Sequence, residues 1–109
     1  MARIAITDGL SESAIELLIN AGHEVDLYPD NLDGFDAVVI RSATKLTKDV
    51  IESSSTLRLI GRAGVGVDNI DLLAATTAGI LVCNTPSAST QSVVELTIGH
   101  LLASIRYIP

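Results

Sequence analysis

Five short aliphatic segments recur along this chain, and they constrain its fold more than any other feature. They are Arg3–Thr7, His23–Tyr28, Phe35–Ile40, Leu57–Gly61 and Ile80–Val82. Hydrophobic residues make up 48% of the 109 residues and aromatic residues only 3%, so Ile, Leu, Val and Ala must form the core. Strands of this composition are typical of a parallel sheet whose two faces are both covered.

Helical patterns fill the intervals between these segments, except that a short polar linker, Asp30–Asp33, joins the second segment to the third. Ser11 is a candidate N-cap for a helix that ends at Ala21, before Gly22. One face of this helix is expected to be apolar, at Ala14, Ile15, Leu17, Leu18 and Ala21. Thr47 can cap a short second helix, and Asp71–Ala78 is expected to form a third.

The order of these elements predicts the fold class. Short apolar strands joined through helices predict an α/β fold, a flavodoxin-like five-stranded parallel sheet with right-handed crossovers and flanking helices. The segment Phe35–Ile40 is nearly all apolar, which favours a central position in that sheet. Ligands of such sheets bind beyond the C-terminal ends of the strands, where the sequence places Asp8, Arg41 and Arg62.

The segment after Pro86 predicts one more helix, longer than the others. Ser92-Val93-Val94-Glu95 is a capping-box pattern, and a helix from there to about Tyr107 would be roughly 24 Å long. Its apolar residues surround most of the circumference, and such a helix is normally buried on more than one side. We therefore expect residues 1–91 to form one domain and residues 92–109 to pack against a partner subunit or a further domain.

A glycine-rich turn follows the fourth aliphatic segment, within LIGRAGVGVDNID at Leu59–Asp71. A dinucleotide-binding loop also has Gly-x-Gly between a strand and a helix, but it needs a third glycine and a carboxylate after the next strand. This chain has Asn69 and Cys83-Asn84 there, so the dinucleotide hypothesis fails. Two hypotheses remain: a cradle of free N–H groups beside Arg62 for a small anion, or a tight turn that merely requires glycine.

Two arginines end neighbouring strands of the expected sheet. Arg41, followed by Ser42, ends the third strand, and Arg62 ends the fourth. Adjacent strands would place their guanidinium groups roughly 5 Å apart. Like charges at that distance repel unless an anion bridges them, and arginine suits a carboxylate or a phosphate. The sequence favours a shared anion; the alternative is that each arginine pairs with an aspartate such as Asp8 or Asp68.

Charge and composition narrow the class of function. The net charge is −6 and no Lys/Arg cluster occurs, which argues against nucleic acid or an anionic membrane as a partner. The single Cys83 cannot form an internal disulfide. Neither a signal peptide nor an apolar run long enough to span a bilayer occurs, so a cytoplasmic location is expected.

The chain offers candidates for binding and none for catalysis. His100 lies in the middle of an apolar helix and is expected in a core or an interface, whereas His23 is expected at the surface. Cys83 is expected to be a small core residue. The sequence contains no metal-ligand spacing and no recognisable acid–base or nucleophile–base pair.

Three motifs are similar to those of one enzyme family. They are Ile40-Arg41-Ser42-Ala43-Thr44-Lys45, Gly61–Asp71, and Asn84-Thr85-Pro86 followed by Ser92–Leu96. In order and spacing they resemble the D-isomer-specific 2-hydroxyacid dehydrogenases, and the Arg-Ser-Ala-Thr piece resembles the phosphoglycerate branch. The resemblance implies a substrate-binding domain that packs across a cleft from a separate Rossmann domain, which would bind most of the cofactor NAD.

The resemblance also implies roles for individual residues. Arg41 and Ser42 would face the substrate, with Arg41 near its phosphate, and Arg62 would contact phosphate or carboxylate. The N–H groups of Val65 and Gly66 would donate to the substrate carboxylate, and Val65 would also touch the nicotinamide end of NAD. The final helix would join the two domains and contribute to a homodimer.

For the full-length protein, the resemblance implies NAD-dependent oxidation of 3-phosphoglycerate to 3-phosphohydroxypyruvate, in the first step of serine synthesis. The family's cofactor fingerprint and catalytic residues would lie beyond Pro109, so the chain alone is expected to be inactive. Ala88-Ser89 departs from the Gly-Asn or Ser-Asn of the family and lacks an asparagine side chain.

Two alternatives remain open. One is a related dehydrogenase that acts on glycerate or lactate. The other is a non-enzymatic flavodoxin-like binding module, such as a signalling receiver. A receiver needs an acidic residue at the end of its third strand, and this chain has Arg41 there.

Overall fold

The computed structural model describes residues 2–85, 94–96, 98, 99 and 103. Five strands lie in this part of the chain: β1 (Arg3–Ile6), β2 (Glu24–Leu27), β3 (Ala37–Ile40), β4 (Leu59–Arg62) and β5 (Leu81–Asn84). Three helices alternate with them: α1 (Glu12–Asn20), α2 (Lys48–Ser53) and α3 (Leu72–Thr77). Ser11, Thr47 and Asp71 cap these helices with their side chains.

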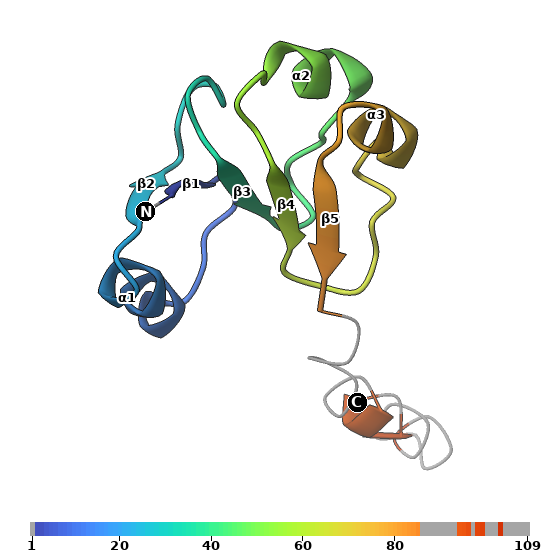
Figure 1. Cartoon of the computed structure of the whole chain (residues 1–109). Helices are drawn as coiled ribbons and strands as arrows, with labels where there is room; N and C mark the ends of the chain where they lie inside the picture. Colours follow the sequence, from blue (N-terminus) through green and yellow to red (C-terminus); the bar gives the residue numbers. More distant parts are fainter. Residues whose placement is uncertain (1, 86–93, 97, 100–102, 104–109) are drawn as a thin grey trace.

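The strands are all parallel and form one sheet in the order β2-β1-β3-β4-β5 (Figure 1). This order confirms the flavodoxin-like α/β fold and the central position of the third strand. The predicted third strand began at Phe35, but β3 begins at Ala37. Phe35 belongs to the preceding turn, where its amide donates to the Leu32 carbonyl (3.3 Å) and its side chain is buried.

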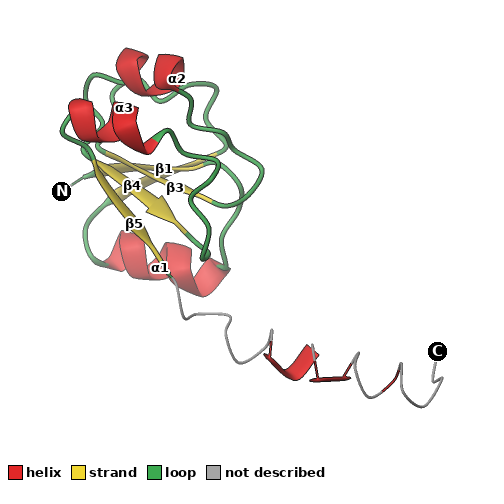
Figure 2. Cartoon of the chain, turned by 90° about the vertical axis from the view of Figure 1, so that its right-hand side faces the viewer, coloured by secondary structure: helices red, strands yellow, loops and turns green. Residues whose placement is uncertain are grey.

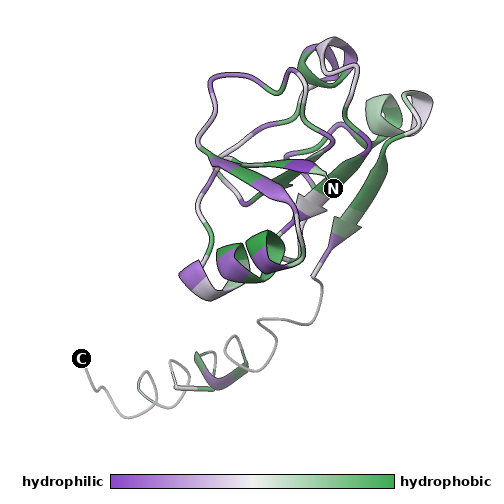
Figure 3. Ribbon diagram, turned by 60° about the vertical axis from the view of Figure 1, so that its left-hand side comes forward, coloured by the Kyte–Doolittle hydropathy of each residue, from purple (hydrophilic) through white to green (hydrophobic). Residues whose placement is uncertain are grey.

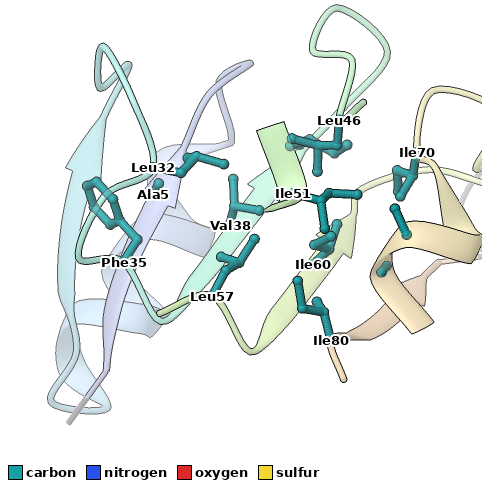
Figure 4. Packing of buried hydrophobic residues seen from close by; sticks show 13 residues of the cluster. Ala5, Leu32, Phe35, Val38, Leu46, Ile51, Leu57, Ile60, Ile70 and Ile80 are labelled. Atoms are coloured by element: carbon teal, nitrogen blue, oxygen red, sulfur yellow. The ribbon is translucent and has the colours of Figure 1, made fainter. Parts of the chain in front are cut away.

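Helices α2 and α3 lie together on one face of the sheet, and α1 lies on the other (Figure 2). The main hydrophobic core lies beneath α2 and α3, on what we call the α2/α3 face (Figure 4). It contains Ala5, Leu32, Phe35, Val38, Ile40, Leu46, Ile51, Leu57, Ile60, Ile70, Ala74, Ala75 and Ile80. Burial of a large aliphatic side chain contributes about 1.5–3 kcal/mol, so this face supplies most of the stabilisation of the fold.

The opposite face is covered less completely. Helix α1 packs beside β2 and has no buried residue, and hydrophobic and hydrophilic residues are interleaved along it in Figure 3. Leu17 lies on the predicted apolar face of this helix and is 71% exposed. The helix contacts β2 at one side of the sheet, and its least exposed residues, Ala14, Ile15 and Leu18, are only partly buried.

Strand β5 forms one edge of the sheet, and α1 packs beside β2 at the other edge. Val82 packs against the core of the α2/α3 face, and the alternation of a strand directs its neighbours Leu81 and Cys83 to the other side. Leu81 is 63% exposed and Cys83 is exposed as well. The predicted core position of Cys83 is therefore wrong, because α1, the helix on that face, packs against β2 at the far edge of the sheet.

The predicted helix over residues 92–107 lies largely outside the described residues, and so does His100. The described positions 94–96, 98, 99 and 103 have helical backbone. The division between residues 91 and 92, and self-association through this segment, stay predictions. In the part of the chain that the structure describes, no helix combines the length and the apolar character needed to cross a membrane.

Candidate functional site

The C-terminal edge of the sheet gathers polar residues from four strands. Asp8 follows β1, Arg41 follows β3, Arg62 ends β4 and Asn84 ends β5. Because Ile40 lies opposite Arg62 in the register of β3 and β4, Arg41 lies one residue beyond Arg62 on the adjacent strand. The prediction that the two arginines end neighbouring strands is confirmed.

A hollow of about 500 Å³ lies at this edge, and we call it the arginine hollow. Three of the predicted site residues line it, namely Arg41, Ser42 and Arg62. The remaining lining comes from Leu10, Ser11, Ala63, Gly64 and Thr85. Among the described residues, the hollow is lined by two guanidinium groups and by no carboxylate, so its electrostatic field favours an anion.

The side chain of Arg62 folds back over its own turn. Its Nη1 donates to the Ala63 carbonyl (3.1 Å), and a Cβ at Gly64 would lie 2.0 Å from the same nitrogen. Its Nε is buried without an acceptor among the described residues. A larger residue at position 64 would displace the guanidinium group, so glycine at this position leaves the space over the turn in which the Arg62 side chain lies.

Residues at the end of β5 hold the glycine turn. The Nδ2 of Asn84 donates to the Val65 carbonyl (2.8 Å), and the amide of Thr85 donates to the Gly64 carbonyl (2.9 Å). The N–H groups of Val65 and Gly66 have no acceptor within residues 2–85. Val65 is 52% exposed, and neither residue lines the arginine hollow. The predicted carboxylate cradle thus lies next to the hollow, outside its lining.

Asp8 binds the loop that follows β3. Its Oδ2 accepts from the amides of Arg41 (2.8 Å) and Thr44 (3.0 Å), and its Oδ1 accepts from the Thr44 hydroxyl. Partial burial raises the pKa of Asp8, but the hydrogen bonds from Thr44 and Arg41 outweigh it and hold the pKa below its usual value.

The carboxylate of Asp8 is therefore engaged by the backbone of the loop. In the described part of the chain, neither Arg41 nor Arg62 forms an ion pair with an aspartate. The alternative in which each arginine pairs with Asp8 or Asp68 is wrong for these residues. Neither guanidinium group has a carboxylate partner among the described residues, and that of Arg62 donates through Nη1 to the Ala63 carbonyl.

A second hollow, of about 560 Å³, shares Ser42 and Arg62 with the arginine hollow. Its other charged residues are Lys45, Lys48, Asp68 and Asp71. Acidic and basic groups are mixed in this lining, whereas the arginine hollow has basic groups only. An anion is therefore favoured in the arginine hollow.

Sequence reasoning missed the function of Asn69, which was noted only as a departure from the dinucleotide fingerprint. Its Nδ2 donates to the carbonyls of Arg41 and Thr44, both at 2.7 Å. An asparagine in a turn is a signal for side-chain-to-backbone hydrogen bonds. The partners lie 28 and 25 residues away, however, and no local pattern identifies them.

The remaining candidates have structural roles or lie elsewhere. His23 is half-buried, and its Nδ1 accepts a hydrogen bond from the Ala2 amide (3.0 Å). Within the described residues, no group of three or more His, Cys, Asp or Glu side chains is placed to hold a metal ion. The site is therefore built from arginines, backbone amides and hydroxyl groups.

Comparison with known proteins finds one matching family and several proteins of similar sequence. The family described as D-isomer specific 2-hydroxyacid dehydrogenase, catalytic domain, matches residues 4–104. D-3-phosphoglycerate dehydrogenase from Methanocaldococcus jannaschii is 49% identical over 117 residues, which cover 100% of this chain and 22% of that protein. Hydroxypyruvate reductase from Thermotoga maritima is 42% identical over 115 residues, which cover 97% of this chain and 37% of that protein.

A solved structure agrees with these relatives. The crystal structure of NAD+-bound 3-phosphoglycerate dehydrogenase from Entamoeba histolytica matches with a TM-score of 0.82 and 30% identity, over 98% of this chain and 40% of that chain. The present chain thus spans only about a fifth to two fifths of the length of these proteins.

Proposed function

This chain belongs to the D-isomer specific 2-hydroxyacid dehydrogenase family, and we propose that it is the substrate-binding part of an NAD-dependent D-3-phosphoglycerate dehydrogenase. The reaction would convert 3-phosphoglycerate to 3-phosphohydroxypyruvate in the first step of serine synthesis. The observation that carries the proposal is the arginine hollow, where two guanidinium groups without an ion pair in the described chain line one cavity. The identity to the Methanocaldococcus enzyme supports phosphoglycerate as the substrate within the family.

The proposed substrate has an anionic group at each end, and the site offers two sets of donors. Arg41 is exposed at the rim of the hollow, and its planar fork suits a phosphate. Arg62 and the free amides of Val65 and Gly66 suit the carboxylate. In this proposal the chain binds the acid at both ends and orients the carbon that is oxidised.

The described residues do not form a dinucleotide site. Asn69 occupies the position of the third glycine, and Cys83-Asn84 stands where the fingerprint requires a carboxylate. NAD, which accepts the hydride, is therefore assigned to a separate domain, with Val65 as the proposed contact from this chain. The 109-residue chain is expected to bind the substrate without oxidising it.

The phosphate assignment is tested by Arg41→Ala. Hydrogen bonds to charged groups contribute about 1.5–3 kcal/mol, so the variant should bind 3-phosphoglycerate about 10- to 100-fold more weakly. Isothermal titration calorimetry on the chain measures this change. Arg58→Ala is the matched control, because Arg58 is also exposed but precedes β4 at the opposite edge of the sheet. The control should bind as the wild type does.

An unphosphorylated hydroxy acid is the second candidate, and similarity to the hydroxypyruvate reductase favours it. Glycerate distinguishes the two, because it lacks the phosphate that Arg41 is proposed to bind. Equal affinity of the wild type for glycerate and 3-phosphoglycerate, unchanged in Arg41→Ala, would refute the phosphate assignment. Turnover of 3-phosphoglycerate with NAD by the chain alone would refute the assignment of catalysis to another domain.

A further inference from the structure

The loop from Arg41 to Thr44 is held at both of its ends by two side chains from other parts of the sheet. At each end the N–H group donates to Asp8 and the carbonyl accepts from Asn69. Asp8 lies in the turn after β1, and Asn69 lies in the turn after β4. Strands β1 and β4 flank β3 on its two sides, so the loop is clamped from both directions.

The middle of the loop is left free. The amides of Ser42 and Ala43 have no acceptor within residues 2–85, and the guanidinium group of Arg41 has no ion pair there. The loop therefore presents amide, hydroxyl and guanidinium donors at the arginine hollow. Donors grouped in this way bind an anion well only when the backbone that presents them is held in one shape.

The groups that clamp the loop match their partners in chemical type, while the Oδ1 of Asn69 is buried without a partner among the described residues. An ionised carboxylate can only accept hydrogen bonds, and the Asp8 carboxylate accepts from three donors. The nitrogen of a side-chain amide can donate two hydrogen bonds, and the Nδ2 of Asn69 donates to two carbonyl oxygens. If the Asn69 side-chain amide were turned by 180°, its Oδ1 would face the carbonyl oxygens of Arg41 and Thr44. These two carbonyls therefore determine the orientation of the amide.

The position of Asn69 is itself anchored in the core. The amide of Leu46 donates to the Asn69 carbonyl (2.8 Å), and Leu46 and Ile70 form a short parallel bridge. Both of these side chains are buried. The packed core is thereby connected, through one asparagine, to the loop that carries Arg41.

We propose that Asp8 and Asn69 are positioning residues for anion binding, which hold the Arg41–Thr44 loop in the shape that presents Arg41 and Ser42 to the ligand. The inference rests on the proposed function, because the ligand is the phosphorylated hydroxy acid. Neither Asp8 nor Asn69 lines the arginine hollow, so their effect on binding passes through Arg41 and not through a contact of their own.

Two nearly isosteric variants test this role on the 109-residue chain. Asn69→Asp removes two donors, and Asp8→Asn removes part of an acceptor. Each should weaken the binding of 3-phosphoglycerate about tenfold. Each should also speed hydrogen exchange at the amides of Arg41 and Thr44, as measured by NMR without ligand: Asp8→Asn weakens their acceptor, and Asn69→Asp loosens the loop that carries them.

Matched controls carry the same substitutions elsewhere. Asn31→Asp changes an asparagine whose Oδ1 accepts from the Asp33 amide (3.0 Å), and Asp36→Asn changes an aspartate whose Oδ2 accepts from the Arg3 amide (2.9 Å). Neither residue lines the arginine hollow. Both controls should leave the affinity and the exchange of the loop amides unchanged.

A double-mutant cycle distinguishes positioning from general stabilisation. If Asn69 acts through Arg41, then Asn69→Asp should weaken binding less than about twofold further in the Arg41→Ala background. Full additivity of the two losses would overturn the inference, and so would unchanged loop exchange or unchanged affinity in the single variants. In those cases wild-type binding that depends on Arg41 still supports the proposed function. If the wild type does not bind 3-phosphoglycerate at all, both proposals fail.

Discussion

The α2/α3 face of the sheet and the C-terminal edge of the same sheet are held in place by different interactions. On the face, aliphatic side chains such as Ile60 and Ile51 are almost fully buried against one another. At the edge, the polar side chains of Asp8, Asn69 and Asn84 bind backbone groups of neighbouring loops. A packed core tolerates few changes in side-chain volume. The hydrogen bonds at the edge depend instead on which atom is the donor and which is the acceptor. The face thus stabilises the fold, and the edge shapes the candidate site.

The largest effect is expected on the packed face, from Ile60→Ala. Ile60 is 0% exposed and lies in the middle of the core, so the substitution removes buried methyl groups and leaves a cavity. Its free energy of unfolding should fall by about 2–5 kcal/mol, as measured by urea denaturation. A loss below about 1 kcal/mol would mean that the core of this face collapses around the missing atoms.

An intermediate loss of stability is expected at the C-terminal edge of the sheet, when the pH is lowered far enough to protonate Asp8. The folded-state pKa of Asp8 is depressed, so its stabilising contribution is present above the pKa of an unfolded aspartate, about 3.9. That contribution is lost as the pH falls through the lower folded-state value. Because Asp8 is only partly buried, we expect about 1 kcal/mol.

Comparison of the wild type with Asp8→Asn measures this contribution. The wild type should be the more stable protein at neutral pH, and the difference in free energy of unfolding should shrink as the pH falls below about 4. Thermal denaturation at a series of pH values provides the measurement. A difference that stays constant down to the lowest pH would contradict the ionised, hydrogen-bonded state of Asp8.

The smallest effect is expected at Leu81, which is apolar but outside the packed face. The residue is 63% exposed, and Leu81→Thr keeps a side chain that suits a strand. The free energy of unfolding of the chain should change by less than about 0.5 kcal/mol. A loss near that of Ile60→Ala would show that Leu81 is covered in solution, and the contrast between the two sides of the sheet would disappear.

The errors of prediction follow from the same contrast. Leu17 was expected on the apolar face of its helix and Cys83 in the core, since an apolar residue in a helix or a strand usually has one face to pack against. Whether that face is covered depends on where α1 lies over the sheet. Helix α1 packs beside β2, and both residues are exposed.

The class of fold, the helix caps at Ser11 and Thr47, the central third strand and the two arginines at neighbouring strand ends could all be predicted from the sequence. These features depend on local hydrophobic pattern and on the rule that parallel strands end at one edge. The hydrogen bonds that build this edge became visible in the folded chain alone. The Asn69 and Asp8 side chains find their loop partners 25 to 36 residues away, and Gly64 is explained by the guanidinium group above it. Hydrogen-bond partners distant in sequence are chosen by the folded geometry, so no local pattern can predict them.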